Sequence, residues 1–350
     1  MKKINLLQLI SGLGQGGAEQ LIFDLSKEYK KNNNINNYIV SISDDITMLS
    51  QFKNNDLNIK VLFHKKTIKD FIYTIKELIL FIKQNNISII HAHMFHSLVI
   101  ASLLKIKFPN IKIVFTPHNY NIGSILRECI VWLLKPYRDV DVLFADDMKR
   151  WFHKNRYEII PNGIKTDEFT IQSKKNDIFT FIAVGNIKKA KNYLYLIHCI
   201  NNLKNKFNFQ LYIIGDGKDK ALLESEIKKL SLEKYVFLKG FQENVATLLS
   251  QAHCLVMPSL WEGMPLVILE AAASNIPVIV TPVGAIPSIV NQHNGYIVEL
   301  KDFCVTMQYV YDNYNESIAK SNILHSIVLE HYSIEKISAK YQSLYIRMCV

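Results

Sequence analysis

Two glutamates, Glu262 and Glu270, stand eight residues apart around a Gly-Met-Pro loop. The apolar run at residues 254–258 predicts a buried strand before this loop, and residues 266–273 hold helix-forming side chains without a breaker. A tight turn between strand and helix leaves backbone N–H groups free at the helix start, which favours phosphate or hydroxyl-rich ligands. With a helical rise of about 1.5 Å per residue, Glu270 lies roughly one turn deeper than Glu262. Each carboxylate can therefore hold vicinal hydroxyls, one pair on a sugar and one on a ribose.

The segment from residue 258 to residue 284 resembles the Glu-x7-Glu region of the family 4 retaining glycosyltransferases, which have the two-domain GT-B architecture. The resemblance implies that Glu262 contacts the transferred sugar and that Glu270 contacts the nucleotide ribose. It also assigns donor binding to the loop and the helix start, at Gly263, Met264, Pro265 and Leu266. A helix that merely carries two surface glutamates remains the structural alternative.

A glycine-rich loop at residues 12–17 follows the first predicted strand and opens the first predicted helix. Its spacing satisfies the dinucleotide fingerprint, which also requires an acidic residue at the end of the second strand. Asp44 and Asp45 are the candidates for that acid, and both come late in the sequence. The same loop matches the Gly-Gly-x-Glu signature of family 4, which implies that Gly16 and Gly17 touch the donor phosphate. A glycine turn that only joins a strand to a helix is the alternative.

Histidines follow two of the predicted strands. His91, His93 and His96 could suggest a metal site, but no neighbouring carboxylate or cysteine completes one. The family resemblance instead places His118 near the transferred sugar, and His93 and Asn119 on the acceptor side. A structural capping role for these histidines stays open.

The loop after the strand at residues 179–184 is rich in lysine, and it resembles a family loop whose cations neutralise a diphosphate leaving group. Lys191 matches the family's lysine, and Gly185 matches its glycine. Asn186 stands where the family usually has arginine, which removes one cationic donor. Lys188 or Lys189 could compensate, although solvated loop lysines are the common alternative.

The chain alternates predicted strands with predicted helices, a pattern that indicates doubly wound parallel sheets. Strands are expected at residues 4–10, 37–42, 59–63, 87–91, 112–116, 140–145, 179–184, 209–214, 236–239, 254–258, 277–281 and 295–299. Helices are expected at residues 18–30, 68–84, 96–105, 125–134, 193–206, 218–230, 245–251, 266–273, 286–291 and 315–347. In the helix at residues 68–84, the apolar side chains from Ile68 to Ile82 are expected to face inward. The turn after the strand at residues 209–214 includes Gly215, which the resemblance places on the nucleotide side.

The pattern restarts near residue 177, and the polar stretch at residues 170–177 is the predicted linker. We expect an N-terminal Rossmann-like acceptor-side domain at residues 1–168 and a C-terminal nucleotide-sugar-binding domain at residues 169–332. The resemblance implies that the two domains face each other across a cleft. It also implies that a final helix at residues 333–350 crosses back to the first domain.

The composition is that of a globular protein with a formal net charge of +10, which suits anionic lipids or phosphorylated substrates. No nucleic-acid-binding signature is present, so nucleic acid is not an expected partner. The five cysteines are scattered and are expected to be buried or unpaired thiols in a reducing compartment, without metal-ligand spacing. No run of about 20 apolar residues occurs, so we expect a cytoplasmic protein. The basic, aromatic segment at residues 120–138 could contact an anionic membrane at its inner face or could be an ordinary packed helix.

These observations together predict an α/β protein of the GT-B type that moves a sugar from a nucleotide-diphosphate donor to a hydroxyl, with retention of configuration. The acceptor is expected to be a surface polysaccharide or a lipid-linked glycan, and no cofactor or metal is implied beyond the nucleotide sugar itself. The alternatives are an NAD-dependent oxidoreductase, a GT-B-type sugar-nucleotide epimerase and an inactive sugar-nucleotide-binding subunit. An epimerase should carry acid/base carboxylates on the N-terminal side, which the sequence does not show.

Overall fold

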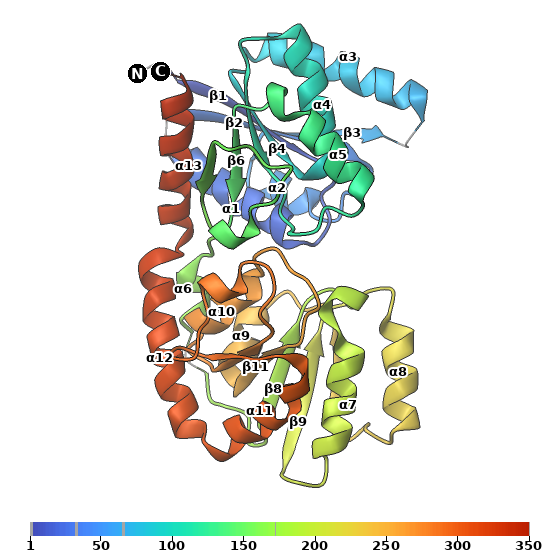
Figure 1. Ribbon diagram of the computed structural model, residues 1–350, viewed down its shortest axis with the longest axis vertical. Helices are drawn as coiled ribbons and strands as arrows, with labels where there is room; N and C mark the ends of the chain where they lie inside the picture. The colour runs from blue at the N-terminus through green and yellow to red at the C-terminus, as the bar shows by residue number, and fades with distance from the viewer. Residues whose placement is uncertain (1–2, 32–33, 65–66, 172, 350) are drawn as a thin grey trace. The chain divides into compact units, whose positions relative to one another are not determined.

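The computed structural model describes residues 3–31, 34–64, 67–171 and 173–349 (Figure 1). The chain forms two compact units. Unit 1 comprises Met1–Gly163 together with Ile334–Val350, and unit 2 comprises Ile164–Ser333. The division therefore falls in the turn that ends at Gly163, rather than after residue 168 or in the polar stretch at residues 170–177.

Unit 1 is built on a parallel sheet whose strand order is β3-β2-β1-β4-β5-β6-β7. Its strands are β1 (Ile4–Ile10), β2 (Ile35–Ser43), β3 (Ile59–His64), β4 (Ile89–His93), β5 (Lys112–Thr116), β6 (Val140–Leu143) and β7 (Tyr157–Ile159). Its helices are α1 (Gly17–Lys31), α2 (Leu49–Asn54), α3 (Ile68–Gln84), α4 (Met94–Lys107), α5 (Ile125–Leu133), α13 (Ile334–Cys349) and the short 3-10 helices η1 (Lys135–Tyr137) and η2 (Asp146–Met148). β1 pairs with β4, with Leu6 opposite Ile89, and β4 is the middle strand of this order.

Alternate side chains of the unit 1 strands feed two apolar layers, because successive strand residues point to opposite faces. Leu7 of β1 packs in the layer that holds α3 and α4. Leu6 packs in the other layer, together with Tyr29 of α1 and Tyr341 of α13. The C-terminal helix α13 is therefore part of the unit 1 core and lies against α1 (Figure 1).

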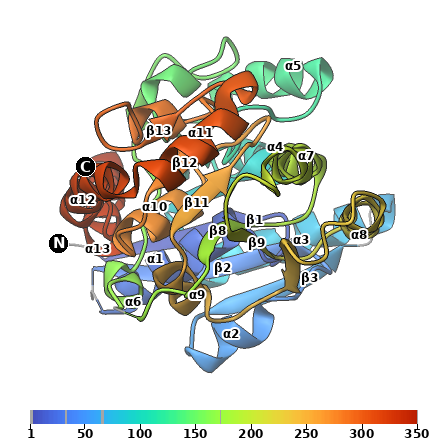
Figure 2. The ribbon, with the colours of Figure 1, turned by 90° about the horizontal axis from the view of Figure 1, so that it is seen from below.

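Unit 2 repeats the arrangement with the strand order β10-β9-β8-β11-β12-β13, again parallel. Its strands are β8 (Phe179–Val184), β9 (Phe209–Ile214), β10 (Val236–Gly240), β11 (Cys254–Met257), β12 (Val278–Val280) and β13 (Tyr296–Ile297). Its helices are α6 (Thr166–Phe169), α7 (Tyr193–Leu203), α8 (Lys220–Lys229), α9 (Val245–Gln251), α10 (Leu266–Ala273), α11 (Leu300–Asp312), α12 (Tyr314–His331) and the short η3 (Lys189–Lys191) and η4 (Ile286–Ser288). Helix α10 packs against α12 (Figure 2).

The cysteines differ from the expectation in one respect. Cys199 of α7 and Cys304 of α11 form a disulfide between the two helices. The prediction of scattered thiols is therefore wrong for this pair, because two cysteines far apart in sequence meet where α7 packs against α11. The remaining three are free, and Cys254 is buried whereas Cys129 and Cys349 are exposed.

Further differences are local. In α3, Ile68 and Ile72 are 81% and 50% exposed, because the helix turns Leu78 and Ile82 toward the sheet instead. The helix expected at residues 286–291 is only the 3-10 turn η4. The strand and α-helices that were not predicted are β7, α2, α6 and α11. Among the described residues, no helix is long and apolar enough to cross a membrane. The same residues contain no group of three or more potential ligands that could hold a metal ion.

Candidate functional site

The strand order of unit 2 indicates the edge of its sheet at which a ligand is expected to bind. From β8 the chain runs outward through β9 and β10, then returns to β11 on the other side of β8. In such sheets ligands bind beyond the carboxyl ends of the strands where the direction reverses. The loops at this point are residues 185–192 after β8 and residues 258–265 after β11. They contain Lys191 and Glu262.

Lys191 and Glu262 form an ion pair. The Nζ of Lys191 lies 2.8 Å from Oε1 of Glu262, and the two side chains are only 11% and 13% exposed. Lys191 is the last residue of η3, and the loops of β8 and β11 are also joined by a backbone hydrogen bond from Leu260 to Ala190. The sequence prediction brings these two residues to one site, and the structure places them in direct contact.

Ser259 and Thr281 hold the Glu262 carboxylate in place. The hydroxyl of Ser259 donates to Oε1 of Glu262 at 2.8 Å, and the hydroxyl of Thr281 donates to the carbonyl of Ser259 at 2.6 Å. Both Ser259 and Thr281 are buried. A hydrogen bond to a charged group contributes about 1.5–3 kcal/mol, so this chain of contacts orients the carboxylate.

Tyr193 closes the site behind Gly185. Its hydroxyl lies 3.4 Å from the carbonyl oxygen of Gly185, and burial together with the charge of Glu262 raises the pKa of Tyr193. A Cβ on Gly185 would approach the Cε atom of Lys191 to 2.8 Å, and the residue has a φ of +142°. Glycine is therefore required here both by its backbone angle and by the lysine that passes over it.

Gly284 fixes the backbone of the glutamate loop. It has a φ of +60°, and a Cβ there would lie 2.5 Å from the carbonyl oxygen of Glu262 and closer still to that of Gly263. The N–H of Ala285 donates to the carbonyl of Gly263 at 2.8 Å. The turn after β12 therefore clamps the loop that carries Glu262.

The remaining residues predicted for donor binding in unit 2 lie in the loops and helix starts that follow its strands. Gly215 follows β9, and its N–H donates to Gly240 at 2.8 Å. Glu270 lies on α10, and Pro265 stands at the N-cap of that helix without a side-chain hydrogen bond to it. Asn186 is exposed and lies beside Gly217. A Cβ placed on Gly217 would lie 2.8 Å from Oδ1 of Asn186. Met264 and Leu266 are buried.

In unit 1, the glycine loop follows β1, next to the point where the strand order reverses between β1 and β4. Gly16 and Gly17 are exposed at the start of α1. Asp45, the candidate ribose acid of a dinucleotide site, instead closes a local turn. Its carboxylate accepts the hydroxyl of Thr47 at 2.9 Å, and its carbonyl accepts the N–H of Leu13 at 2.8 Å.

His93 and His118 form one buried relay. Nδ1 of His93 lies 2.8 Å from Nε2 of His118, and Nε2 of His93 lies 2.6 Å from Oε1 of Gln8. His93 is fully buried, and His118 is 8% exposed and has a φ of +61°. Burial lowers the pKa of His118 to about 3, so its imidazole is neutral at pH 7. Asn119, next to it, is exposed.

His91 ties the C-terminal helix to the same strand. Its two ring nitrogens lie 2.7 Å from the hydroxyl of Tyr345 on α13 and 2.8 Å from the hydroxyl of Thr116 on β5. Burial lowers the pKa of His91 well below its usual value. Its role in the structure is therefore to anchor α13.

Comparison with known protein families finds a matching family model for each half of the chain. Residues 15–168 match the family model described as Glycosyltransferase Family 4, and residues 164–304 match the one described as Glycosyl transferases group 1. The two matched ranges together span most of the chain, and each unit therefore resembles a domain type found in glycosyltransferases. The predicted fold class is confirmed.

Two characterised relatives illustrate the range of the group. The UDP-Gal:alpha-D-GlcNAc-diphosphoundecaprenol alpha-1,3-galactosyltransferase of Escherichia coli is 31% identical over 233 residues, which cover 59% of this chain and 57% of the relative. The N-acetyl-alpha-D-glucosaminyl L-malate synthase of Bacillus anthracis is 26% identical over 218 residues, which cover 61% and 55%. The chain thus spans little more than half the length of these curated relatives.

Two solved structures show the same fold. HepE from Anabaena in complex with UDP and glucose superimposes with a TM-score of 0.85 at 14% identity, covering 97% of this chain and 99% of that one. The sucrose-phosphate synthase of Thermosynechococcus elongatus has a TM-score of 0.86 at 16% identity, with coverages of 98% and 99%. The oxidoreductase and epimerase alternatives are not favoured, because both units match glycosyltransferase families.

The sequence prediction did not include four residues that shape the site: Gln8, Tyr193, Ser259 and Thr281. Ser259 precedes Glu262 by three residues, and that short spacing is the one sequence signal that could have found it. Thr281 and Tyr193 reach the pair from other loops, which only the fold brings together. The contact of Gly284 with the Glu262 backbone was not predicted either.

Proposed function

We propose that the protein transfers a sugar from a nucleotide-diphosphate sugar to an acceptor hydroxyl with retention of configuration. The observation that carries this proposal is the Lys191–Glu262 ion pair at the carboxyl edge of the unit 2 sheet. A cation and a carboxylate held side by side suit a ligand that has a diphosphate at one end and sugar hydroxyls at the other. The family resemblance assigns Glu262 to the sugar and Glu270 to the ribose.

Cleavage of the bond between the sugar and the diphosphate requires stabilisation of the departing diphosphate. Negative charge develops on the phosphate oxygens while the sugar becomes oxocarbenium-like, so fixed donors that already point at those oxygens lower the barrier. Lys191 supplies one such charge, and the backbone N–H groups at the start of α10 supply dipoles. The resemblance assigns the backbone of Gly16 and Gly17 to the donor phosphate as well. Lys188 and Lys189, both exposed, stand in for the charge that Asn186 lacks.

His118 enters the proposal as a neutral hydrogen-bonding group near the sugar. Its lowered pKa prevents a positive charge that would oppose the oxocarbenium-like transition state. His93 and Gln8 fix the orientation of its ring. We assign His93 to this positioning role and leave the acceptor hydroxyl to exposed groups such as Asn119.

For the acceptor, we propose a growing surface polysaccharide or a lipid-linked glycan at the inner face of the cell membrane. The name of the E. coli relative specifies a diphosphoundecaprenol-linked sugar as its acceptor. The formal charge of +10 suits contact with anionic lipid. Activity takes place without a dedicated metal, since Lys191 and the helix start provide the positive charge.

Donor binding tests the proposal. We expect isothermal titration of UDP-, GDP- and other nucleotide sugars to identify one that binds, and Lys191→Met to weaken its binding by roughly tenfold or more, because it removes the buried cation. Lys229→Met is the matched control, since its side chain is 69% exposed on α8. The anomeric configuration of the product, read by NMR, then tests retention.

Three results would count against the proposal. Tight NAD binding without binding of any nucleotide sugar would favour an oxidoreductase. Conversion of the donor without an acceptor into an epimer would favour an isomerase. Donor binding with no turnover across a panel of glycan and lipid-linked acceptors would favour an inactive subunit.

A further inference from the structure

Helix α5 turns its apolar side chains away from the protein. Within α5, all of which the structure describes, Val131 is the one buried residue. By contrast, Ile125, Leu126 and Leu133 are 68%, 67% and 62% exposed. At about 100° per residue these three lie on the side of the helix roughly opposite Val131. A surface helix of a globular protein normally places such a stripe in the core, so this one is available to a partner.

Two tryptophans extend this stripe. The indole nitrogen of Trp151 donates to Oε2 of Glu128 on α5 at 2.9 Å. Trp132 lies one helical turn beyond Glu128 on the same side, as residues four apart do. Both indoles are about half exposed, at 48% for Trp132 and 47% for Trp151. We call the surface formed by Ile125, Leu126, Trp132, Leu133 and Trp151 the tryptophan face.

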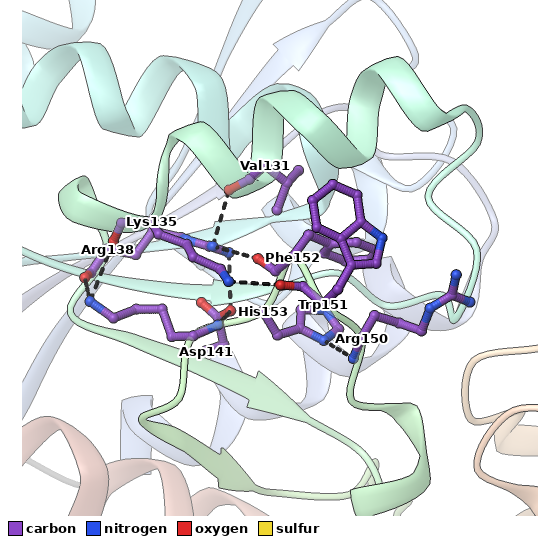
Figure 3. Close-up of polar contacts among 9 residues, drawn as sticks. Val131, Lys135, Arg138, Asp141, Arg150, Trp151, Phe152 and His153 are labelled. Atoms are coloured by element: carbon purple, nitrogen blue, oxygen red, sulfur yellow. Dashed lines mark hydrogen bonds and ion pairs between the residues drawn. The ribbon is translucent and has the colours of Figure 1, made fainter.

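A buried arginine holds the two parts of the tryptophan face together (Figure 3). The guanidinium of Arg138 donates to the carbonyl of Val131 on α5 at 3.1 Å and to that of Phe152 at 3.0 Å. The Nζ of Lys135 donates to the carbonyl of Trp151 at 2.7 Å. The loop that carries Trp151 is therefore fixed against α5, and the face exists before any partner arrives.

The charge of Arg138 is balanced inside the protein. Its guanidinium lies 3.0 Å from Oδ2 of Asp141, and neither side chain has any exposed area. The N–H of Lys154 donates to the same carboxylate oxygen at 2.8 Å. A buried ion pair of this kind adds little net stability, because the cost of desolvating both charges offsets most of their attraction. Its contribution here is to fix the loop beneath the tryptophan face.

The surroundings of the tryptophan face are basic. His153, in the same loop, accepts the N–H of Arg150 at 3.0 Å. Burial, together with the nearby charges of Arg138, Lys135, Arg150 and Lys149, lowers the pKa of His153 to about 3. Arg150 also lies 3.7 Å from Glu128, which balances the acidic side chain on α5. The cations Lys135, Lys149 and Arg150 therefore border an apolar surface.

We propose that the tryptophan face binds a bilayer surface that contains anionic phospholipids. Aliphatic side chains that offer no hydrogen bonds suit acyl chains, indoles suit the boundary between acyl chains and headgroups, and the bordering lysines and arginine suit phosphate. A glycan partner would require hydrogen-bonding side chains where Ile125, Leu126 and Leu133 stand. This inference deepens the proposed function and rests on it for its purpose, which is to bring the enzyme to a lipid-linked acceptor.

Vesicle binding tests the inference on the full chain. Co-sedimentation is measured with vesicles of phosphatidylcholine alone and of phosphatidylglycerol and phosphatidylcholine in equal parts. We expect binding to the anionic vesicles that weakens with salt, and a loss on the order of tenfold or more in Trp132→Ser/Leu133→Ser. The matched control is Val305→Ser/Ile323→Ser, which removes two exposed apolar side chains from unit 2 (71% and 48% exposed).

Cys129 gives an independent readout. It is exposed on α5, between Ile125 and Leu133 around the helix. An environment-sensitive dye attached there in the Cys349→Ser background should shift to shorter wavelength with anionic vesicles. A dye on Cys349 in the Cys129→Ser background should not.

The outcomes are distinct. Absence of vesicle binding, equal binding by the Trp132/Leu133 double variant, or equal binding to neutral vesicles would overturn the inference. A dimer that this variant dissociates would make a second copy of the chain the occupant, and retention by a soluble anionic polysaccharide alone would make it a glycan; either result would also overturn it. Donor titration in the same preparations separates the two proposals. Loss of donor binding counts against the enzyme function, whereas loss of vesicle binding counts only against bilayer binding by the tryptophan face.

Discussion

At the scale of single residues, the site in unit 2 depends on how Glu262 is held. Its carboxylate receives a lysine ammonium and a serine hydroxyl on the same oxygen, Oε1. The sequence predicted Glu262 and Lys191 because each stands in a segment that resembles a motif of the family. It could not predict Thr281, because nothing in the chain marks which residue of a later loop will reach Ser259.

Ser259→Ala tests this arrangement. We expect kcat/KM for sugar transfer to fall by roughly tenfold, because a hydrogen bond to a charged group is worth about 1.5–3 kcal/mol and its loss lets the carboxylate rotate. Ser326→Ala is the control, since that hydroxyl bonds only its own helix backbone at Asn322. An unchanged kcat/KM in Ser259→Ala would show that Lys191 alone orients Glu262.

At the scale of elements, substitutions at two glycines with left-handed backbone angles distinguish the cost of a steric clash from the cost of backbone strain. Gly284 has a φ of +60° and faces the carbonyls of Glu262 and Gly263, whereas Gly240 has a φ of +67° with nothing within 4 Å of a Cβ. Gly240→Ala should cost about 1 kcal/mol of unfolding free energy, through backbone strain alone. Gly284→Ala should cost clearly more and should also lower donor affinity, since the glutamate loop must move. Denaturant unfolding and donor titration measure both; equal effects would mean that the loop yields freely.

The elements themselves were mostly predictable, and the failures share a cause. Elements whose apolar residues form a clear pattern, such as the continuous buried run of β1 and the one-sided apolar stripe of α1, were found from the sequence. Helix α5 has an equally clear apolar stripe, but periodicity gives only the stripe and not the direction in which it points. The disulfide between Cys199 and Cys304 was missed because it depends on the packing of α7 against α11, which sequence spacing does not reveal.

The disulfide has its own check. Denatured protein kept without reductant should titrate three thiols, and reduced protein five, because two of the five cysteines are paired. Cys199→Ser/Cys304→Ser should lose about 2–4 kcal/mol of stability through greater freedom of the unfolded chain. Cys349→Ser is the control that removes an exposed free thiol. Five thiols without reductant would show that the pair is open in solution.

At the scale of the whole molecule, the C-terminal helix returns to unit 1 and is held there by polar as well as apolar contacts. The apolar contacts of Ile334, Ile337 and Leu344 place it on the sheet. The bond between His91 and Tyr345 fixes its register against β4. Burial keeps the His91 imidazole neutral, as it does those of His93 and His118, so the attachment of α13 and the His93–His118 contact both involve buried neutral rings.

Acid should therefore destabilise unit 1 in a defined direction. Burial lowers the pKa of His118 to about 3 and the pKa values of His91 and His93 well below 6.5, so these rings stay neutral in the folded state. The unfolded chain binds protons below about pH 6.5, so each such histidine reduces stability by about 1.4 kcal/mol per pH unit as the pH falls from there toward its folded pKa. Hydrogen exchange of β4 and β5 amides between pH 7 and pH 4, corrected for intrinsic rates, measures this slope. His118→Gln should make it shallower, whereas His331→Gln, at an exposed position on α12, should not. A slope that is the same in wild type and His118→Gln would mean that the relay takes up a proton within the folded protein.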